Sequence, residues 1–324
     1  MSIQLNKLFS ASVIALSLAT LTVGGGSVYA ASPMVKTQAP GYYRTMLGSY
    51  ELTAISDGTI DVPADKLLSE DASATVYTLH KAYQEVPVET SVNTYLINTG
   101  SKLILFDTGA GTLFGPTLGK FVDNLKAAGY DPSQIDEVYL SHLHPDHSGG
   151  LALNGKAVFP TATIYVNKVE ADFWLNLKNK ETASDISKSF FEGTNASVQP
   201  YIATGRFKTF AANSQIAPGI KVIDASGHTP GHVAFDIKSG KDELVLIGDL
   251  IHVPAVQLDH SEVTIAYDVD ADKARASRKA FFDSISKEGQ LVGASHISFP
   301  GLGHLNKPTS TTYQWVPVIY QRMK

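Results

Sequence analysis

The run His142-Leu143-His144-Pro145-Asp146-His147 places four potential metal ligands close together in the chain. Neither a helix nor a strand can direct all four side chains to one point, because side chains repeat every ~3.6 residues in a helix and alternate in a strand. They can converge where a strand ends and the chain turns. The apolar run 135–140 predicts that strand, and Ser148-Gly149-Gly150 allows the turn. The sequence therefore predicts a metal-binding loop at a strand end.

A single histidine is more often an ordinary core or surface residue than a ligand, and Asp249 by itself could simply cap a turn. Histidine and carboxylate are, however, the ligands that zinc and similar divalent metals prefer. More of them recur downstream, each shortly after a short apolar run that predicts a strand. These are His228 after 222–225, Asp249 after 244–247 and His296 after 291–294.

The composition is that of an ordinary soluble protein of one domain, with 44% apolar and 18% charged residues in 324. The net charge of −5 and the lack of a basic patch make nucleic acid an unexpected partner. The chain has no cysteine, so neither disulfides nor a thiolate ligand or nucleophile can contribute.

Residues 1–30 have the pattern of a signal peptide. Lys7 is their one charged residue, an apolar run follows from Leu8 to Val23, and Val28 and Ala30 fit a cleavage site after Ala30. A membrane anchor is the alternative, but the run is short and rich in Ser, Thr and Gly. We expect a periplasmic or secreted protein with no stable membrane insertion after cleavage, a polar arm over 31–49 and a single domain over 50–324.

The remaining pattern interleaves strands and helices, with polar residues just after strand ends. It predicts an α/β (α+β) fold in which two sheets are sandwiched between helices, with the site in loops along one edge. Residues 59–90 are weakly patterned and are expected to form a loop with a short helix. Strands are expected at 50–57, 92–98, 103–106, 135–140, 161–166, 222–225, 232–237, 243–247 and 291–294, and helices at 117–128, 170–177 and 272–285.

The His-x-His-x-Asp-His run, the later Gly-His-Thr-Pro-Gly-His at 227–232, the pair Gly248-Asp249 and the distant His296 together resemble the metallo-β-lactamase superfamily. The resemblance extends from Tyr50 to about Tyr320. It implies a four-layer αβ/βα sandwich of two mixed sheets flanked by helices, with two divalent metal ions, by default zinc, although manganese, iron or cobalt fit the same ligands. It also implies that His142, His144 and His228 hold one metal, that Asp146, His147 and His296 hold the other, and that Asp249 bridges them.

Within the superfamily, four segments resemble the secreted methyl parathion hydrolase group and its lactonase-like relatives: 39–44, 113–119, 171–174 and 296–304. The resemblance implies a homodimer and an aromatic pocket of Phe114, Trp174 and Phe190, for which core packing is the alternative. Methyl parathion hydrolase has Arg where Leu67 aligns and Leu where His252 stands, and it also differs at Ile265 and Tyr267. These differences favour lactones and aryl esters such as dihydrocoumarin over phosphotriesters.

The other histidines are interpreted by position. His232 and His304 lie beside ligand segments in the sequence and are expected to support the ligands. His252, three residues after Asp249, is expected in the substrate pocket. His80 and His260 have no such context and are expected on the surface.

Two cations that share Asp249 would lower the pKa of a shared water, so that hydroxide could attack an ester or lactone carbonyl. Asp249 and Asp146 are the candidate catalytic residues. The sequence has no Gly-x-Ser-x-Gly motif, which argues against a serine esterase. The alternatives are an organophosphate hydrolase, a true β-lactamase, a glyoxalase-type thioesterase, a nuclease of the same superfamily and a non-catalytic periplasmic metal-binding protein.

Overall fold

The structure of the protein is a computed structural model that describes residues 32–320 and 322–323. The chain divides into two units, Met1–Gln38 and Ala39–Lys324. The described part of the first unit, residues 32–38, contains no helix or strand. The predicted signal peptide lies outside the described residues. The predicted arm over 31–49 is wrong in its second half, because residues 42–47 form a strand that pairs with the next one.

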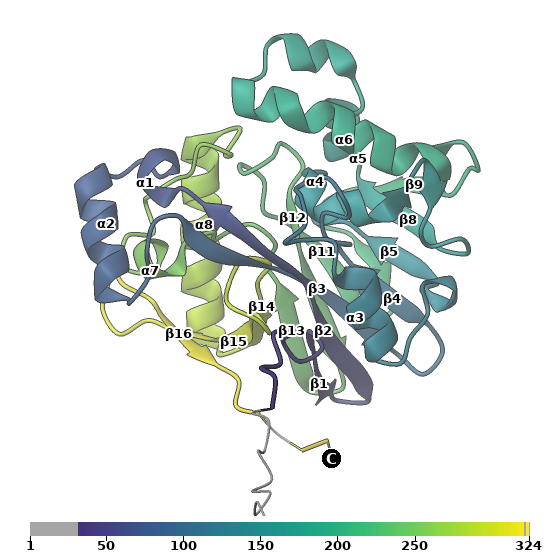
Figure 1. Ribbon diagram of the computed structural model, residues 1–324, viewed down its shortest axis with the longest axis horizontal. Helices are drawn as coiled ribbons and strands as arrows, with labels where there is room; N and C mark the ends of the chain where they lie inside the picture. The colour runs from purple at the N-terminus through teal and green to yellow at the C-terminus, as the bar shows by residue number, and fades with distance from the viewer. Residues whose placement is uncertain (1–31, 321, 324) are drawn as a thin grey trace, which may run out of the picture. The chain divides into compact units, whose positions relative to one another are not determined.

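The second unit contains two mixed seven-stranded sheets (Figure 1). In the first sheet the first four strands pair in antiparallel fashion, and the pairs β4–β5, β5–β8 and β8–β9 are parallel. Its order is β1 (Tyr42–Leu47), β2 (Tyr50–Val62), β3 (Val88–Asn98), β4 (Leu103–Phe106), β5 (Glu137–Tyr139), β8 (Thr163–Asn167) and β9 (Phe207–Phe210).

The second sheet is antiparallel except for the parallel pair β13–β14. A separate small hairpin is formed by β6 (Ala152–Leu153) and β7 (Lys156–Ala157). The order of the second sheet is β10 (Gln215–Ala217), β11 (Ile220–Asp224), β12 (Val233–Ser239), β13 (Asp242–Leu246), β14 (Leu291–Gly293), β15 (Leu302–Asn306) and β16 (Gln314–Pro317).

Helices cover the outer faces of both sheets. The α-helices are α1 (Ala64–Leu67), α2 (Ala72–Lys81), α3 (Phe121–Ala127), α4 (Pro145–Ser148), α5 (Lys168–Trp174), α6 (Asp185–Ile202), α7 (Pro254–Gln257) and α8 (Ala271–Glu288), and the 3₁₀ turns are η1 (Pro132–Gln134), η2 (Gly149–Leu151) and η3 (Leu177–Glu181). None of the helices in the part of the chain that the structure describes is long and apolar enough to cross a membrane.

The central strands are apolar on both faces, and this pattern produces the layers. Along β4, Ile104 and Phe106 pack between the two sheets, whereas Leu105 packs outward against α3, α5 and α6. Along β13, Leu244 and Leu246 face the other sheet and Val245 packs outward against α8. Successive side chains of a strand point to opposite faces, so a continuous apolar run requires a cover on each side. The predicted four-layer sandwich of two mixed sheets flanked by helices is confirmed.

Helix α6 was not predicted from the sequence. Gly193 and Pro200 lie inside it, together with several Ser, Thr and Asn residues, all weak helix formers. Tertiary packing outweighs this low propensity, because Phe191, Val198 and Tyr201 are fully buried against the outer face of the first sheet. The region 59–90 is also more regular than expected, since β2 continues to Val62 and two helices follow before β3.

The contact between the two sheets offers a test of the fold. Phe235 on β12 is 1% exposed and packs 4.9 Å from the ring of Phe106 on the opposite sheet. Phe235→Ala is expected to lower the free energy of unfolding by about 3–5 kcal/mol, because it leaves a cavity between the sheets. Urea unfolding at constant metal content measures this. Tyr77→Ala, at a side chain that is 67% exposed, should change stability by less than about 0.5 kcal/mol, and equal losses in the two variants would contradict the assignment.

Candidate metal centre

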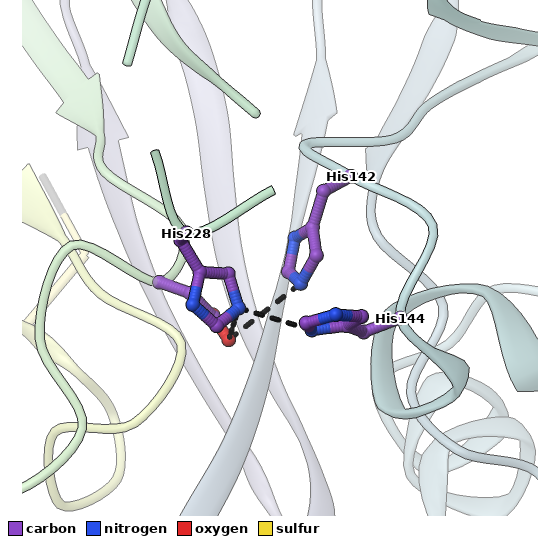
Figure 2. A group of neighbouring side chains, drawn as sticks. His142, His144 and His228 are labelled. Atoms are coloured by element: carbon purple, nitrogen blue, oxygen red, sulfur yellow. Dashed lines mark hydrogen bonds and ion pairs between the residues drawn. The ribbon is translucent and has the colours of Figure 1, made fainter. Parts of the chain in front are cut away.

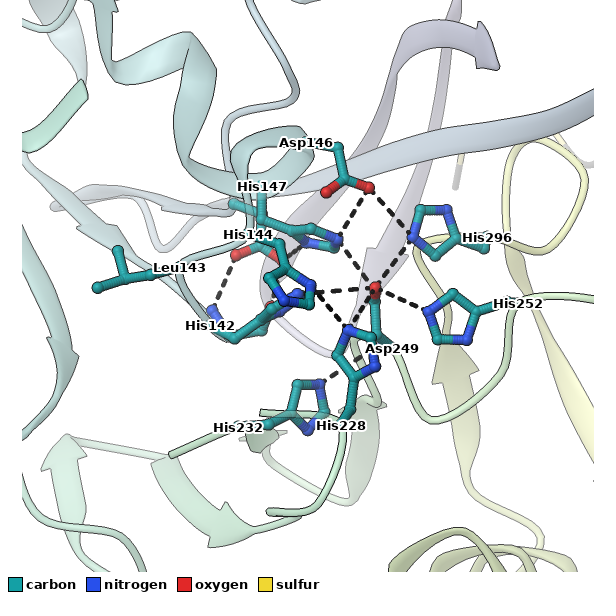
Figure 3. A network of polar contacts seen from close by, with 12 residues as sticks. His142, Leu143, His144, Asp146, His147, His228, His232, Asp249, His252 and His296 are labelled. Carbon is teal, nitrogen blue, oxygen red and sulfur yellow. Dashed lines mark hydrogen bonds and ion pairs between the residues drawn. The ribbon is translucent and has the colours of Figure 1, made fainter. Parts of the chain in front are cut away.

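Seven side chains that are far apart in the sequence meet where strands of both sheets end (Figure 3). The loop after β5 and the short α4 carry His142, His144, Asp146 and His147; the loops after β11, β13 and β14 carry His228, Asp249 and His296. They form two groups in which all ligand atoms lie within 4.8 Å of one another: His142, His144, His228 and Asp249; and Asp146, His147, Asp249 and His296. These are the two sets that the sequence resemblance implied, with Asp249 shared.

The first group has the spacing of a coordination shell (Figure 2). His228 Nε2 lies 3.0 Å from His144 Nδ1 and 3.3 Å from Asp249 Oδ2, and His142 Nε2 lies 3.7 Å from the same oxygen. Tetrahedral zinc with Zn–N distances of 2.0–2.1 Å separates its ligand atoms by about 3.3 Å. The four atoms are therefore placed to surround one ion.

The second group has similar spacing. His147 Nε2 lies 3.1 Å from Asp249 Oδ1 and 3.5 Å from Asp146 Oδ2. His296 Nε2 lies 3.1 Å from Asp249 Oδ2 and 3.5 Å from Asp146 Oδ2. The carboxylate of Asp249 faces both groups, which is the arrangement that a bridging ligand requires.

Buried polar atoms without partners show that the site suits cations. His142 Nε2, His147 Nε2 and Asp249 Oδ1 are buried and have no hydrogen-bond partner among the described residues. A buried polar atom without a partner costs about 1–3 kcal/mol, and a divalent ion in each group would remove that cost. The residues present therefore fit two divalent metals.

Outer hydrogen bonds orient four of the five histidine ligands through the ring nitrogen that faces away from the centre. His147 Nδ1 lies 3.0 Å from Asp107 Oδ2, and His228 Nδ1 lies 2.9 Å from Asp268 Oδ1. Such partners fix the tautomer and leave the inner nitrogen free for the metal. The other two contacts are His142 Nδ1 to Ser141 Oγ at 3.0 Å and His296 Nδ1 to the carbonyl of Ser91 at 2.9 Å.

Asp107 and Asp268 were missed in the sequence. Asp107 follows β4 directly and precedes Thr108-Gly109, so the same strand-end signal that identified the ligands was present. It accepts hydrogen bonds from both the backbone N–H and the hydroxyl of Ser141. Asp268 follows no strand, and no local signal marks it; its role depends on how residues 265–270 fold against His228.

The charge states of His142, His144 and Asp249 suit metal ligands. Burial holds the pKa of His142 and His144 well below the ordinary histidine value, so both rings are neutral and offer lone pairs. Burial alone would raise the pKa of Asp249, but the neighbouring positive charges of His147 and His296 hold it well below the usual range. Asp249 is thus ionised, as a bridging carboxylate must be.

His232 lies beside the centre, as predicted. Its Nε2 accepts the backbone N–H of Asp249 at 3.0 Å, and its Nδ1 lies 3.0 Å from the carbonyl of Ala225. Burial lowers the pKa of His232 to about 3, so the ring stays neutral and can accept this bond. His232 thereby fixes the backbone that carries the shared carboxylate.

The prediction for His304 is wrong. This residue is exposed on β15, with Nδ1 3.0 Å from the carbonyl of Gln290. Because β15 runs antiparallel to β14, with Gly303 level with Val292, it carries His304 back from the strand end where His296 lies. His80 and His260 are exposed, in agreement with the prediction.

A cavity of about 170 Å³ opens beside the ligands. Four predicted pocket residues line it: Phe114, Phe190, His252 and Tyr267. The lining also includes Ile60, Val62, Thr90 and Ile186, which the sequence did not suggest, and the ligands His144, Asp146, Asp249 and His296.

The predictions for Trp174, Leu67 and Ile265 are wrong, since none of them lines this cavity. Trp174 is fully buried, with its ring centroid 5.1 Å from that of His144 and 4.6 Å from that of Phe191. Leu67 and Ile265 belong to a separate apolar cluster around α1, α2 and α7. These three side chains support the walls from behind.

The sequence of residues 87–296 matches the model of the metallo-beta-lactamase superfamily. The chain belongs to this superfamily. Among solved structures, hydrolase AbOPH of the beta lactamase superfamily shares 38% identity and a TM-score of 0.84, over 88% of this chain and 100% of AbOPH. AidC, a dizinc quorum-quenching lactonase in complex with a product, shares 28% identity and a TM-score of 0.79, over 87% and 99%. An N-acyl homoserine lactonase from Bacillus sp is 25% identical over 226 residues, which are 62% of this chain and 79% of the relative.

The lactonase and hydrolase relatives and the two ligand groups of this chain both indicate a hydrolase with two metals. This metallo-beta-lactamase superfamily member is a metal-dependent hydrolase of ester bonds with two divalent metal ions, of which zinc is the expected species.

Metal binding to the first group should depend on pH. Burial alone would lower the pKa of His228, but its hydrogen bonds to Asp249 and Asp268 raise it to about 9. In the metal-free protein the ring is therefore protonated at pH 7, and the metal must displace that proton. Apparent zinc affinity should fall about tenfold for each pH unit below 9 if one proton is released.

Calorimetric titration in buffers of different ionisation enthalpy measures the protons released. Asp268→Asn removes one of the contacts that raise the pKa of His228, so the affinity should level off at a lower pH in that variant. An affinity that stays constant between pH 6 and 9 would contradict this assignment.

Proposed function

We propose that the protein opens neutral lactones and cleaves aryl esters, with dihydrocoumarin as the type of substrate. The cavity beside Asp146 and Asp249 carries this proposal. Its walls are mostly apolar, with Phe114 and Phe190 as aromatic members. A flat aromatic lactone fits such walls, and the reacting carbonyl would lie at the ligand side of the cavity.

The charge of the cavity supports a neutral substrate. No lysine or arginine is among its lining residues within residues 32–320. Substrates with a carboxylate, such as β-lactams, are commonly held by an arginine or lysine. The ionisable lining groups here are the ligands Asp146 and Asp249 and the histidines of the centre. This argues against a β-lactamase and against a thioesterase for glutathione conjugates.

The residues around Asp249 have defined tasks in this proposal. When bound, the divalent ions supply Lewis acidity and make a water acidic enough to ionise near neutral pH. Asp249 orients that water or accepts its proton, with its own backbone fixed by His232, and Asp146 faces the same cavity. His252 Nε2 lies 3.2 Å from Asp249 Oδ2, and its buried Nδ1 has no hydrogen-bond partner among the described residues. Burial lowers the pKa of His252 to about 4, so a neutral ring lines the cavity beside Asp249.

The relatives favour lactones. Several curated relatives are N-acyl homoserine lactonases, and AidC is a lactonase with N-hexanoyl-L-homoserine as the bound product. Opening a lactone and cleaving an aryl ester both require attack on a carboxylic ester carbonyl, so one site serves both. We propose homoserine lactones as a further substrate group.

Phosphotriesters of the methyl parathion type are the second candidate, as a weak side activity. They are also neutral, so the charge of the cavity does not distinguish them. His252 and Tyr267 in the wall are the residues that differ from methyl parathion hydrolase. A purely metal-binding protein is disfavoured, because the cavity gives a small molecule direct access to Asp146 and Asp249.

We further propose that the protein is exported and forms a homodimer. The leader pattern of residues 1–30 supports export, and the dimer rests on the sequence resemblance alone. N-terminal sequencing of the mature protein and light scattering in solution test these two proposals.

Removing the metals tests the hypothesis that the protein is a two-metal hydrolase. Zinc-loaded protein should hydrolyse dihydrocoumarin, lose that activity on chelation and regain it with zinc. Asp249→Asn should lower kcat/KM by more than about 100-fold, because even outer partners of metal ligands contribute 10- to 100-fold. Full activity after complete metal removal would overturn the two-metal mechanism. If the zinc-loaded protein hydrolysed no ester, lactone or phosphotriester, this result would favour the alternative of a non-catalytic metal-binding protein.

The wall of the cavity gives a second test. Phe114 lines the cavity, whereas the neighbouring Leu113 is 42% exposed and does not. Phe114→Ala should raise KM for an aryl lactone about tenfold with a smaller change in kcat, because it removes apolar contact that is present in ground and transition states alike. Leu113→Ala is the matched control and should leave KM near the original value. Equal effects of the two substitutions would place the substrate elsewhere.

A further inference from the structure

We propose that Glu170 is a positioning residue that sets the distance between the two loops holding the first metal. It lies on α5 and is 0% exposed. Its Oε1 accepts the backbone N–H of Leu143 at 2.9 Å, and its Oε2 accepts the backbone N–H of Gly231 at 2.8 Å. One carboxylate therefore bonds two loops at once.

The two bonded residues lie inside the ligand motifs. Leu143 stands between His142 and His144, in the loop that leaves the first sheet. Gly231 follows His228 by three residues, in the loop between β11 and β12 of the second sheet. Glu170 thus links the loops of the first ligand group across the sandwich. The hydrogen bonds fix how far the imidazoles of one loop stand from the imidazole of the other.

Neighbouring side chains complete this link. Asn167, at the start of α5, donates its amide to the carbonyl of Gly231 at 2.9 Å. Thr194 on α6 donates its hydroxyl to the carbonyl of Leu143 at 2.6 Å. A Cβ at position 231 would lie only 2.3 Å from the backbone nitrogen of Glu170, so glycine is required for this close approach. In Leu143 and in Gly231, both the backbone N–H and the backbone carbonyl are therefore hydrogen-bonded to side chains of α5, its N-cap or α6.

His144 makes the first group sensitive to this link. It is the one histidine ligand whose outer nitrogen, Nε2, is buried without a hydrogen-bond partner in the described part of the chain. Its ring is supported by packing, with centroids 5.1 Å from Trp174 and 4.9 Å from Phe190. Trp174 follows Glu170 by one helical turn, on the same face of α5. The position of His144 therefore depends on α5 through both its backbone and its ring.

The second metal depends less directly on this link. His147 is oriented by Asp107 and His296 by the carbonyl of Ser91, and neither contact involves α5. Loss of the Glu170 link should therefore weaken the first metal selectively. A residue that only stabilised the fold would weaken both metals together or neither.

Glu170→Gln is the sharpest test, because it keeps size and shape. An amide offers one acceptor oxygen, so one of the two backbone N–H groups would face an N–H₂ donor instead. We expect affinity for the first zinc to fall about 10- to 100-fold while the second stays unchanged. Competition titration with a chelating dye at buffered free zinc measures both constants, and at intermediate zinc the stoichiometry should fall from two to one.

Double variants identify which metal is lost. Adding Glu170→Gln to His228→Ala, which already lacks a ligand of the first group, should have little further effect on zinc content. Adding it to His296→Ala should release the one remaining tightly bound zinc. The opposite pattern would overturn the proposal.

Asp57→Asn is the matched control. Asp57 is 0% exposed and accepts three backbone N–H groups, from Ala110, Gly119 and Phe121, none of which lies in a ligand loop. It should lower stability without changing the zinc stoichiometry. Two zinc ions bound with original affinity in Glu170→Gln, equal loss of both, or the same selective loss in Asp57→Asn would each overturn the proposal.

Thr194→Val tests the same proposal if the Glu170→Gln variant does not fold. It removes only the bond to the carbonyl of Leu143 and should weaken the first zinc several-fold in the same selective way. An unchanged first zinc in this variant would overturn the proposal. Because the readout is metal content and not turnover, the outcome is independent of whether lactones are the substrate.

Discussion

The carboxylate of Asp249 is the group on which the rest of the site depends. Its Oδ2 lies 3.1 Å from His296 Nε2 and 3.3 Å from His228 Nε2, and its Oδ1 lies 3.1 Å from His147 Nε2, with 2% of the residue exposed. A buried charge surrounded by imidazoles from three other loops is stable only if the charges balance and every polar atom has a partner. Two divalent cations meet both conditions. The rest of the structure holds the ligand loops in place around this carboxylate.

Holding them requires both sheets, because the ligands come from strand ends of each. The apolar layer between the sheets fixes their separation, and buried polar side chains then adjust the loops. Asp107, directly after β4 of the first sheet, orients His147, and Asp268, in the segment before α8, orients His228. Asp268 is itself adjacent to Arg278 of α8, which is 1% exposed and donates to the carbonyls of Leu250, Ser261 and Val263. The outer helices thereby reach the metal centre through hydrogen bonds, and Glu170 on α5 acts in the same way.

The ligands were predictable because their signal is local. A short apolar run followed within two residues by His or Asp marks the end of a strand, and His142, Asp249 and His296 all follow this pattern. The strand-end rule was applied too narrowly, since Asp107 follows β4 and was overlooked. A different argument, closeness in the sequence to a ligand segment, failed for His304, because the antiparallel turn between β14 and β15 carries it away from His296.

The pocket was less predictable than the ligands. Phe114, Phe190, His252 and Tyr267 do line the cavity, but Trp174 is turned inward to support His144, and Leu67 and Ile265 pack behind the wall. Whether an aromatic or aliphatic side chain faces a cavity or the core depends on how helices such as α6 settle on the sheet, and the composition of α6 gives no clear helical pattern. Glu170 shows the same limit: its sequence context suggests only a helix, and its carboxylate gains its two partners from loops about 27 and 61 residues away.

By itself the sequence identified the candidate metal ligands and the strands that bring them to one edge, because ligand chemistry and strand periodicity are properties of neighbouring residues. Only the tertiary structure decided which buried groups orient those ligands, which side chains form the wall of the cavity and how the two sheets are linked at the metals. Those contacts join residues distant in the chain, and their energies arise only once the layers have packed and water has been excluded.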